Sequence, residues 1–293
     1  MLLNSLKKVI SGIELIRIKH WIKNLFVFVP LFFSNNFTNY NLILLSISAF
    51  LAFSVGSSII YVINDIIDRE KDRMHPKKKN RPIASGKISI KEGIVIAVIL
   101  LIIEGILFLY NGDKVNMIVG GYIVMNFLYS IKLKNVVLVD VFVIAFGFIF
   151  RVMAGAFAIN VVMSDWLLLT TFSISMFLGF GKRRNELKYC EGKNSTRKVL
   201  EKYRMGAIDS YINMFLSITI VFYCLYSIDM NKKGIYMIAT VPLVIYGMLR
   251  YNLLLHYSEN SGDPTDVVLK DRNIILTCIT YVVMIVVLYC IKG

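Results

Sequence analysis

Nine long apolar stretches constrain this chain more than any other feature of its sequence. They cover residues 22–34, 42–63, 88–110, 115–131, 136–158, 165–181, 210–229, 234–255 and 273–291. A helix of about 20 mostly apolar residues crosses a bilayer, so stretches near this length predict nine transmembrane helices. The composition agrees, because 57% of the 293 residues are apolar and soluble domains usually have about 45–50%. We expect an all-α, multi-pass membrane protein with a single domain over residues 1–293.

Basic residues are distributed unevenly between the connections of these stretches. Of the 33 lysines and arginines, 28 lie in the N-terminal segment and the connections on its side, and four lie in the connections on the other side. Since basic connections remain in the cytoplasm, we predict a cytoplasmic N-terminus and a C-terminus across the plasma (inner) membrane. Topology thus accounts for most of the net charge of +14, which does not indicate a nucleic-acid partner. The four cysteines have no CxxC spacing and predict no zinc site.

Residues 2–18 predict an amphipathic helix that lies on the membrane surface. Leu6, Val9, Ile13 and Ile16 recur at intervals of three and four residues, with charged residues between them. Because charge interrupts the apolar positions, the segment does not resemble a signal peptide.

Three carboxylates follow the second apolar stretch at helical spacing. Asp65, Asp68 and Asp72 occupy positions i, i+3 and i+7, which lie within about 60° of one another on a helix. Like charges so placed repel one another unless a cation lies among them, and an all-oxygen ligand set favours Mg²⁺ or Mn²⁺ over zinc. The alternative is a solvated helix face whose acids are balanced by the neighbouring basic residues.

A basic loop at residues 75–87 comes directly after these acids. It carries five lysines and arginines and two prolines. Mg²⁺ usually binds one or two carboxylates and takes its other ligands from water and phosphate. Acids for a metal beside bases for phosphate therefore indicate a phosphorylated substrate.

Asn64, Asp65, Asp68 and Asp72 resemble the Asn-Asp-x-x-Asp-x-x-x-Asp signature of the UbiA superfamily of intramembrane prenyltransferases. The segment 81–86, Arg-Pro-Ile-Ala-Ser-Gly, is similar to the Arg-Pro loop that follows this signature in the family. The resemblance implies a UbiA-like bundle of nine helices around a central cavity that opens to the cytoplasm and laterally to lipid. It also implies a Mg²⁺-dependent transferase that acts on a diphosphate donor and a polyprenyl lipid.

Within the superfamily, the chain most resembles the decaprenyl-phosphate phosphoribosyltransferase branch. The segments that carry this resemblance are 17–24 (where Lys19-His20 departs from the branch pattern), 129–140, 151–155, 181–187 and 250–272. It implies phosphoribosyl diphosphate as the donor and a polyprenyl phosphate as the acceptor. The substrate-binding residues that it implies are Lys23, Asn24, Asn64, Arg81, Tyr129, Arg151, Lys182, Arg183 and Glu186.

The connection at 182–204 departs from the wider superfamily. Ordinary members carry a second Asp-rich motif there, whereas this chain has Lys182, Arg183, Arg184 and Glu186. Phosphoribosyl diphosphate carries a 5-phosphate besides its diphosphate, so an additional cationic cluster suits this donor. We expect the connections 64–91 and 182–204 to form the active site on the cytoplasmic side.

The predicted chemistry is stabilisation of a departing pyrophosphate by a metal and by cationic side chains. The predicted metal ligands are Asp65, Asp68 and Asp72, and the catalytic candidates are Asp65, Asp68, Lys134 and Asp140. The predicted ligands of the pyrophosphate oxygens are Arg81, Lys134 and either Lys182 or Arg183. Asp140 would orient a ribose hydroxyl or a lysine.

Two charged residues lie inside predicted helices, where charge is costly and usually paired or functional. Glu104 and Arg151 are about 16 and 15 residues from the cytoplasmic side, which places them at similar depth. Either the two form an ion pair, or Arg151 contributes to the substrate cavity.

Two other functions remain open from the sequence. A prenyltransferase would use the same acidic motif to move a prenyl group from a prenyl diphosphate to an aromatic or other lipid-soluble acceptor. A transporter would also have many spans and buried charge, but no convincing internal repeat is present and the acids lie at the membrane boundary.

Overall fold

The protein is helical throughout the part of the chain that the structure describes. The computed structural model describes residues 2–74, 78–190, 200–232, 234–257 and 270–292, and these ranges contain no β-strand. The contacts between Cα atoms divide the chain into two compact units. Unit 1 comprises Met1–Leu133 and Phe150–Val162, and unit 2 comprises Lys134–Ile149 and Met163–Gly293.

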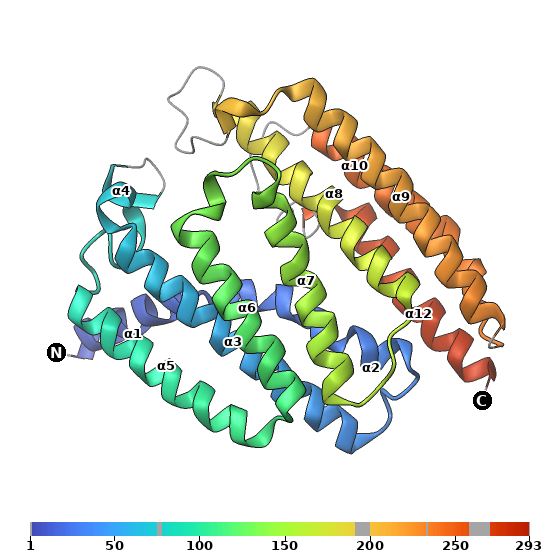
Figure 1. Ribbon diagram of the computed structural model, residues 1–293, viewed down its shortest axis with the longest axis horizontal. Helices are drawn as coiled ribbons and strands as arrows, with labels where there is room; N and C mark the ends of the chain where they lie inside the picture. Colours follow the sequence, from blue (N-terminus) through green and yellow to red (C-terminus); the bar gives the residue numbers. More distant parts are fainter. Residues whose placement is uncertain (1, 75–77, 191–199, 233, 258–269, 293) are drawn as a thin grey trace. The chain divides into compact units, whose positions relative to one another are not determined.

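Unit 1 is built around the long helix α3. Its elements are α1 (Leu2–Ile16), η1 (Ile18–Phe28), α2 (Val29–Phe33), α3 (Tyr40–Ile67), α4 (Arg69–Arg73), η2 (Lys78–Asn80), α5 (Ile90–Tyr110), α6 (Asp113–Ile131) and the second half of α7 (Val139–Ala158). Helix α3 contacts α1, η1, α5 and α6, and it runs beside α5 in Figure 1. Buried Phe53 of α3 packs with Val119 and Tyr122 of α6 in the core of this unit.

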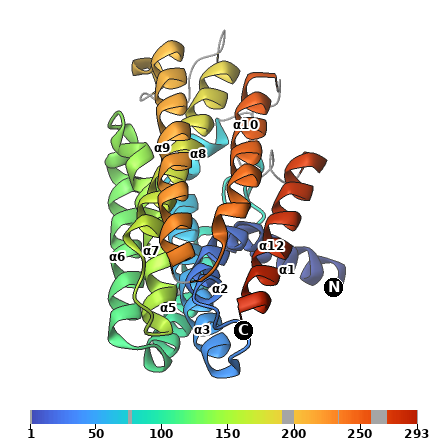
Figure 2. The same ribbon diagram turned by 90° about the vertical axis from the view of Figure 1, so that its right-hand side faces the viewer.

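Unit 2 is dominated by one pair of long helices. Its elements are the first half of α7, η3 (Leu133–Asn135, which straddles the boundary), α8 (Asp165–Cys190), η4 (Leu200–Lys202), α9 (Met205–Lys232), η5 (Met237–Thr240), α10 (Val241–Tyr257) and α12 (Arg272–Lys292). Helices α8 and α9 lie side by side in Figures 1 and 2. Phe177 and Phe180 of α8 pack with Ile208 and Ile212 of α9 in its core.

Six helical segments of the described chain are long and apolar enough to cross a membrane. They are Tyr40–Ile67, Ile90–Tyr110, Val139–Ala158, Met205–Lys232, Met237–His256 and Arg272–Ile291. Each coincides with one of the nine predicted spans. Exposed apolar side chains cover the outer face of α5, including Val98, Ile102 and Leu109, as expected for a helix that faces lipid. The protein is a multi-pass membrane protein.

Two further predicted spans form helices of sufficient length but lower hydropathy. These are α6, with 19 residues, and α8, with 26. Several of their polar side chains bond to the backbone of their own helix. Asn126 donates to the Tyr122 carbonyl of α6, and Thr171 donates to the Leu167 carbonyl of α8. Such local bonds satisfy polar groups without water, which makes both helices compatible with a bilayer.

The predicted span at residues 22–34 is not a single α-helix. The chain forms the 3-10 helix η1 and then the short helix α2, whose start contains Pro30. Proline lacks a backbone N–H, so it favours the beginning of a new helix over the continuation of an old one. A Cβ on Gly155 of α7 would lie 1.9 Å from the Val27 carbonyl oxygen, so the backbone of η1 rests directly on α7.

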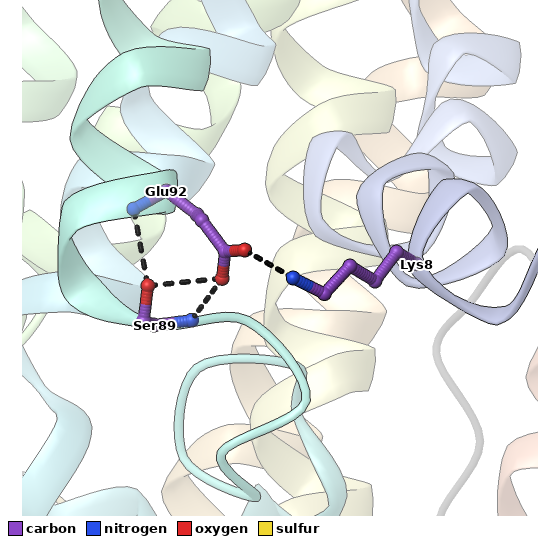
Figure 3. Close-up of polar contacts among 3 residues, drawn as sticks. All are labelled: Lys8, Ser89 and Glu92. Atoms are coloured by element: carbon purple, nitrogen blue, oxygen red, sulfur yellow. Dashed lines mark hydrogen bonds and ion pairs between the residues drawn. The ribbon is translucent and has the colours of Figure 1, made fainter. Parts of the chain in front are cut away.

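The predicted N-terminal helix is present as α1. Its Leu15 is fully buried against α3, whereas Val9, Ile10 and Ile13 are exposed. Helix α1 also contacts the start of α5, where Ser89 and Glu92 form a capping box. Lys8 Nζ of α1 lies 2.6 Å from Glu92 Oε1 (Figure 3). Burial of Leu15 and an exposed ion pair therefore hold α1 against the other helices of unit 1.

Candidate active site

The three predicted metal ligands do not lie on one continuous helix. Helix α3 ends at Ile67, Asp68 is the junction residue, and α4 begins at Arg69. The Asp72 amide still donates to the Asp68 carbonyl at 2.8 Å, so the chain continues with a local break. The three acids therefore lie across the junction of two helices and not on the one uninterrupted helix that their spacing predicts.

Asp65 and Asp72 are brought together by one guanidinium group. Arg81 Nη1 lies 3.2 Å from Asp65 Oδ1 and 2.6 Å from Asp72 Oδ2. Asp65 is 1% exposed and Asp72 is 3% exposed, so both carboxylates are removed from water. Burying such charges is costly unless they are paired, and Arg81 supplies the pairing. We call these residues, together with Arg17, the unit 1 acid cluster.

Arg17 is a member of this cluster that the predicted site residues did not include. Its Nη2 donates to Asp65 Oδ1 at 2.6 Å, and its guanidinium lies 4.6 Å from the centre of the Tyr61 ring. The backbone of Arg17 is left-handed, with φ of 55°, which is uncommon for a residue with a side chain. The sequence signal for Arg17 was its place as the first residue of the segment 17–24, which carries part of the family resemblance.

The donor atoms of the cluster suit a hard divalent cation. Asp65 and Asp72 offer carboxylate oxygens close enough together for one nitrogen to contact both, and Asp68 lies between them in the chain. Oxygen ligands of this kind are those that Mg²⁺ prefers. Among the residues described, no group of three His, Cys, Asp or Glu side chains is already arranged to hold a metal ion.

The basic loop after α4 is ordered by its own contacts where it is described. Arg73 Nε donates to the Ala84 carbonyl at 3.1 Å, and Ile83 is buried against α3 and α5. Gly86 has φ of 78°, a left-handed turn that glycine adopts without strain. Residues 75–77 of the predicted loop lie outside the described part. The described contacts hold Arg81 beside the acids.

Arg151 belongs to a second polar group inside unit 1. Its Nε donates to Asn24 Oδ1 at 2.8 Å, and its Nη2 donates to the Tyr122 hydroxyl at 3.1 Å. Asn24 in turn donates to Ser54 Oγ, and the Arg151 guanidinium lies over the Phe53 ring. The structure thus joins two of the predicted substrate-binding residues, Asn24 and Arg151, in one buried network.

Of the two alternatives for Glu104 and Arg151, the ion pair is not formed. Both carboxylate oxygens of Glu104 are buried without a hydrogen-bond partner among the described residues. Equal depth in the membrane does not determine the side of the helix on which a residue lies. Glu104 faces the interior of unit 1, and Arg151 bonds to Asn24 and Tyr122 instead.

In unit 2, Arg183 lies between two carboxylates. Its Nε is 2.6 Å from Asp140 Oδ2, and its Nη1 donates to Glu186 Oε2. Arg183 is 1% exposed and Asp140 is fully buried. The Tyr203 hydroxyl donates to the other Asp140 oxygen at 2.9 Å. We call Asp140, Arg183, Glu186 and Tyr203 the unit 2 arginine cluster.

Tyr203 was not among the predicted site residues. Burial raises the pKa of its phenol well above the usual range, so the hydroxyl keeps its proton at neutral pH. No sequence pattern connects it to Asp140, because the two are 63 residues apart. The neighbouring Arg184 belongs to the cationic cluster that the sequence predicts in this connection. It bonds to Asp209 and to the Leu255 carbonyl, not to the residues of the arginine cluster.

The other predicted site residues are half-buried. They are Lys23, Asn64, Tyr129, Lys134 and Lys182. Asn64 accepts the Asp68 amide with its backbone carbonyl at 2.9 Å, which places it at the end of α3 beside the acid cluster. Residues 191–199 of the connection at 182–204 lie outside the described part.

The chain is similar to known proteins in sequence and in fold. A sequence profile described as the UbiA prenyltransferase family matches residues 25–269. The decaprenyl-phosphate phosphoribosyltransferase of Corynebacterium glutamicum is 32% identical over 285 residues, covering 94% of this chain and 85% of that protein. A protein of the same name from Mycolicibacterium smegmatis is 29% identical, covering 91% of this chain and 88% of that protein.

A solved structure has the same fold. The UbiA homologue from Archaeoglobus fulgidus, bound to GPP and Mg²⁺, aligns with a TM-score of 0.74 at 14% identity, covering 96% of this chain and 99% of that chain. Since the family profile spans most of the sequence and the fold is shared, this chain belongs to the UbiA prenyltransferase family.

Proposed function

We propose that this protein transfers a phosphoribosyl group from phosphoribosyl diphosphate to a polyprenyl phosphate. A phosphate oxygen of the lipid bonds to the anomeric carbon of the donor, the bond from that carbon to the diphosphate breaks, and pyrophosphate leaves with the electron pair. The observation that carries this proposal is the 32% identity over 94% of the chain to a decaprenyl-phosphate phosphoribosyltransferase.

The unit 1 acid cluster supports the handling of a diphosphate. Asp65 and Asp72, with Asp68 between them, would hold Mg²⁺ or Mn²⁺. When bound, such an ion neutralises the charge that accumulates on the departing pyrophosphate. The guanidinium groups of Arg17 and Arg81 already contact Asp65 and Asp72. Each could bond to phosphate oxygens in place of a carboxylate.

The remaining predicted residues would act on the donor and the acceptor. Lys134, Lys182 and Arg183 provide positive charge for the phosphates, and Lys23, Asn24, Asn64, Tyr129, Arg151 and Glu186 provide polar contacts. A lipid phosphate is already anionic, so the acceptor needs no strong general base. Burial of the reacting carbon would keep water from intercepting it.

We further propose that the chain crosses the plasma membrane nine times as a single domain, with a cytoplasmic N-terminus. Helices α6 and α8 would add two crossings to the six apolar helices. The segment of η1 and α2 would supply the ninth, because a 3-10 helix rises about 2.0 Å per residue and an α-helix about 1.5 Å. Its 11 and 5 residues then reach about 30 Å, the thickness of the hydrocarbon layer.

Donor transfer with purified protein tests the function. Protein in detergent would receive Mg²⁺, a polyprenyl phosphate and phosphoribosyl diphosphate labelled in the ribose, beside parallel reactions with prenyl diphosphates and aromatic acceptors. We expect label in the lipid fraction only with phosphoribosyl diphosphate. Transfer from a prenyl diphosphate alone would replace this proposal with a prenyltransferase.

A further inference from the structure

Tyr203, in the described part of the chain between α8 and α9, contacts the beginning of α7. Tyr203 follows η4 and is 6% exposed. Its hydroxyl donates to Asp140 Oδ1 at 2.9 Å and accepts the Leu138 amide at 2.8 Å. Both hydrogen-bonding roles of the phenol are therefore directed at the first turn of α7.

The Leu138 turn depends on this contact. Leu138 has φ of 67°, a left-handed conformation that a side chain disfavours and that persists where the surroundings hold it. Its carbonyl accepts the amides of Val141 and Phe142, which starts α7. The Leu138 amide points away from that helix and to Tyr203, so the phenol supports the turn that places Asp140.

Asp140 has few other directional contacts. Its Oδ2 is 2.6 Å from Arg183 Nε, but neither atom makes a well-aligned hydrogen bond among the described residues. The contact with Arg183 holds one carboxylate oxygen by charge, and the orientation of the carboxylate also depends on what its other oxygen contacts. The Tyr203 hydroxyl makes the aligned hydrogen bond to Asp140.

We propose that Tyr203 is a positioning residue for Arg183, acting through Asp140. In the absence of the hydroxyl, Asp140 turns, and Arg183 loses its fixed place between Asp140 and Glu186. This inference rests on the proposed function, in which Arg183 binds a phosphate of the donor. A hydrogen bond to a charged group corresponds to roughly a tenfold change or more in binding.

A tyrosine pair in unit 2 provides the test. Tyr203→Phe removes the hydroxyl at the arginine cluster. Tyr223→Phe is the matched control, because Tyr223 is equally buried and bonds through its hydroxyl to Thr240 and Tyr281. We expect Tyr203→Phe to raise the KM for phosphoribosyl diphosphate about tenfold with kcat changed less than about threefold. Tyr223→Phe should leave both constants near wild type, while both variants lower the unfolding temperature similarly.

A double variant separates positioning from a general loss of structure. Arg183→Lys alone should raise the donor KM, and adding Tyr203→Phe to it should raise the KM little further, because both changes affect the same contact. Independent, multiplying effects would overturn the inference, as would an unchanged KM in Tyr203→Phe. The wild-type reaction is a separate result: if only a prenyl diphosphate is a donor, the proposed function fails, and the same comparison is made with the KM for that donor.

Discussion

In both the unit 1 acid cluster and the unit 2 arginine cluster, one arginine contacts two carboxylates. The clusters differ in the element that carries the arginine and in how far its side chain is exposed. In unit 1, two carboxylates on helices share the guanidinium of Arg81, which comes from a loop. In unit 2, two carboxylates share the guanidinium of Arg183, which comes from the helix α8. The side chains of Arg17 and Arg81 are 20% and 26% exposed, whereas that of Arg183 is 1% exposed.

The difference in exposure indicates that the ion pairs of unit 1 can exchange partners, whereas those of unit 2 are fixed. Arginines on a loop and at a helix end can leave their acids when a metal or a diphosphate binds, because water and substrate reach them. An arginine enclosed on a helix cannot leave without depriving a buried carboxylate of its counter-charge, which is costly, so Arg183 would bind a donor phosphate only while it keeps both of its carboxylates. We therefore expect substitutions in unit 1 to affect turnover most and substitutions in unit 2 to affect stability most.

The largest expected effect is on turnover, from Asp65→Asn. Loss of the carboxylate charge removes stabilisation of the departing pyrophosphate, and we expect turnover to fall at least about 1,000-fold, or about 4 kcal/mol. Transfer of labelled ribose to lipid measures it. Glu70→Gln, an exposed acid on α4, is the control and should retain activity. Substantial turnover by Asp65→Asn in protein that still folds would contradict the role of the acid cluster.

Arg183→Met tests the fixed arrangement through stability. Removal of this cation leaves Asp140 buried without its counter-charge, so the free energy of unfolding should fall by about 3–5 kcal/mol. Thermal unfolding in detergent measures the loss. Arg81→Met is the matched change in unit 1, and it should lose turnover but less stability. Equal losses of stability in the two variants would remove the distinction between the clusters.

Two glycines compare the packing of the helices within each unit. In unit 1, Gly155→Ala would place a Cβ against the backbone carbonyl of Val27, and in unit 2, Gly179→Ala would place it 2.7 Å from a Val141 methyl group. We expect both to destabilise by about 1–3 kcal/mol, with Gly155→Ala the greater because backbone moves less readily than a side chain. Gly120→Ala and Gly206→Ala have open space and should change the unfolding temperature little.

The smallest expected effect concerns a more exposed pair of unit 2. Arg250 hydrogen-bonds Asp271 at 2.8 Å and holds the pKa of that carboxyl below its usual range. A lowered pKa stabilises the fold above the ordinary value of about 3.9, and the stabilisation is lost as the pH falls through the pKa of the folded protein.

Asp271→Asn tests this dependence, because it removes the charge and keeps an oxygen for the Ile274 amide. The variant should unfold a few degrees below wild type at neutral pH. The difference should shrink as the pH falls from about 5 to 3. A difference that is constant over this range would show that charge pairing is not its source.

The sequence predicted the helices better than their interruptions. Long apolar stretches determine where α3, α5 and α12 lie, because burial of apolar surface in lipid dominates their energetics. The break at Asp68 has no glycine or proline to indicate it, so a continuous helix was the natural expectation. Within the acid cluster, spacing along the chain predicted the carboxylates, and the shared Arg81 agrees with the predicted basic loop.

The unpredicted contacts depend on the rotation of helices and on long separations in the chain. Depth placed Glu104 near Arg151, but only packing of the helices decides which side chains meet. Tyr203 reaches Asp140 across 63 residues with no repeating pattern between them. Such contacts come from tertiary structure, and a single sequence carries no local trace of them.

The bond from Arg81 to two carboxylates has a mechanical consequence for the broken helix. Asp65 lies before the break at Asp68 and Asp72 lies after it. The Arg81 guanidinium therefore connects the two helices across the break. The junction of α3 and α4 is thereby held by a side chain as well as by the backbone hydrogen bonds that continue across it. Withdrawal of that side chain would remove one constraint on the separation of the two acids.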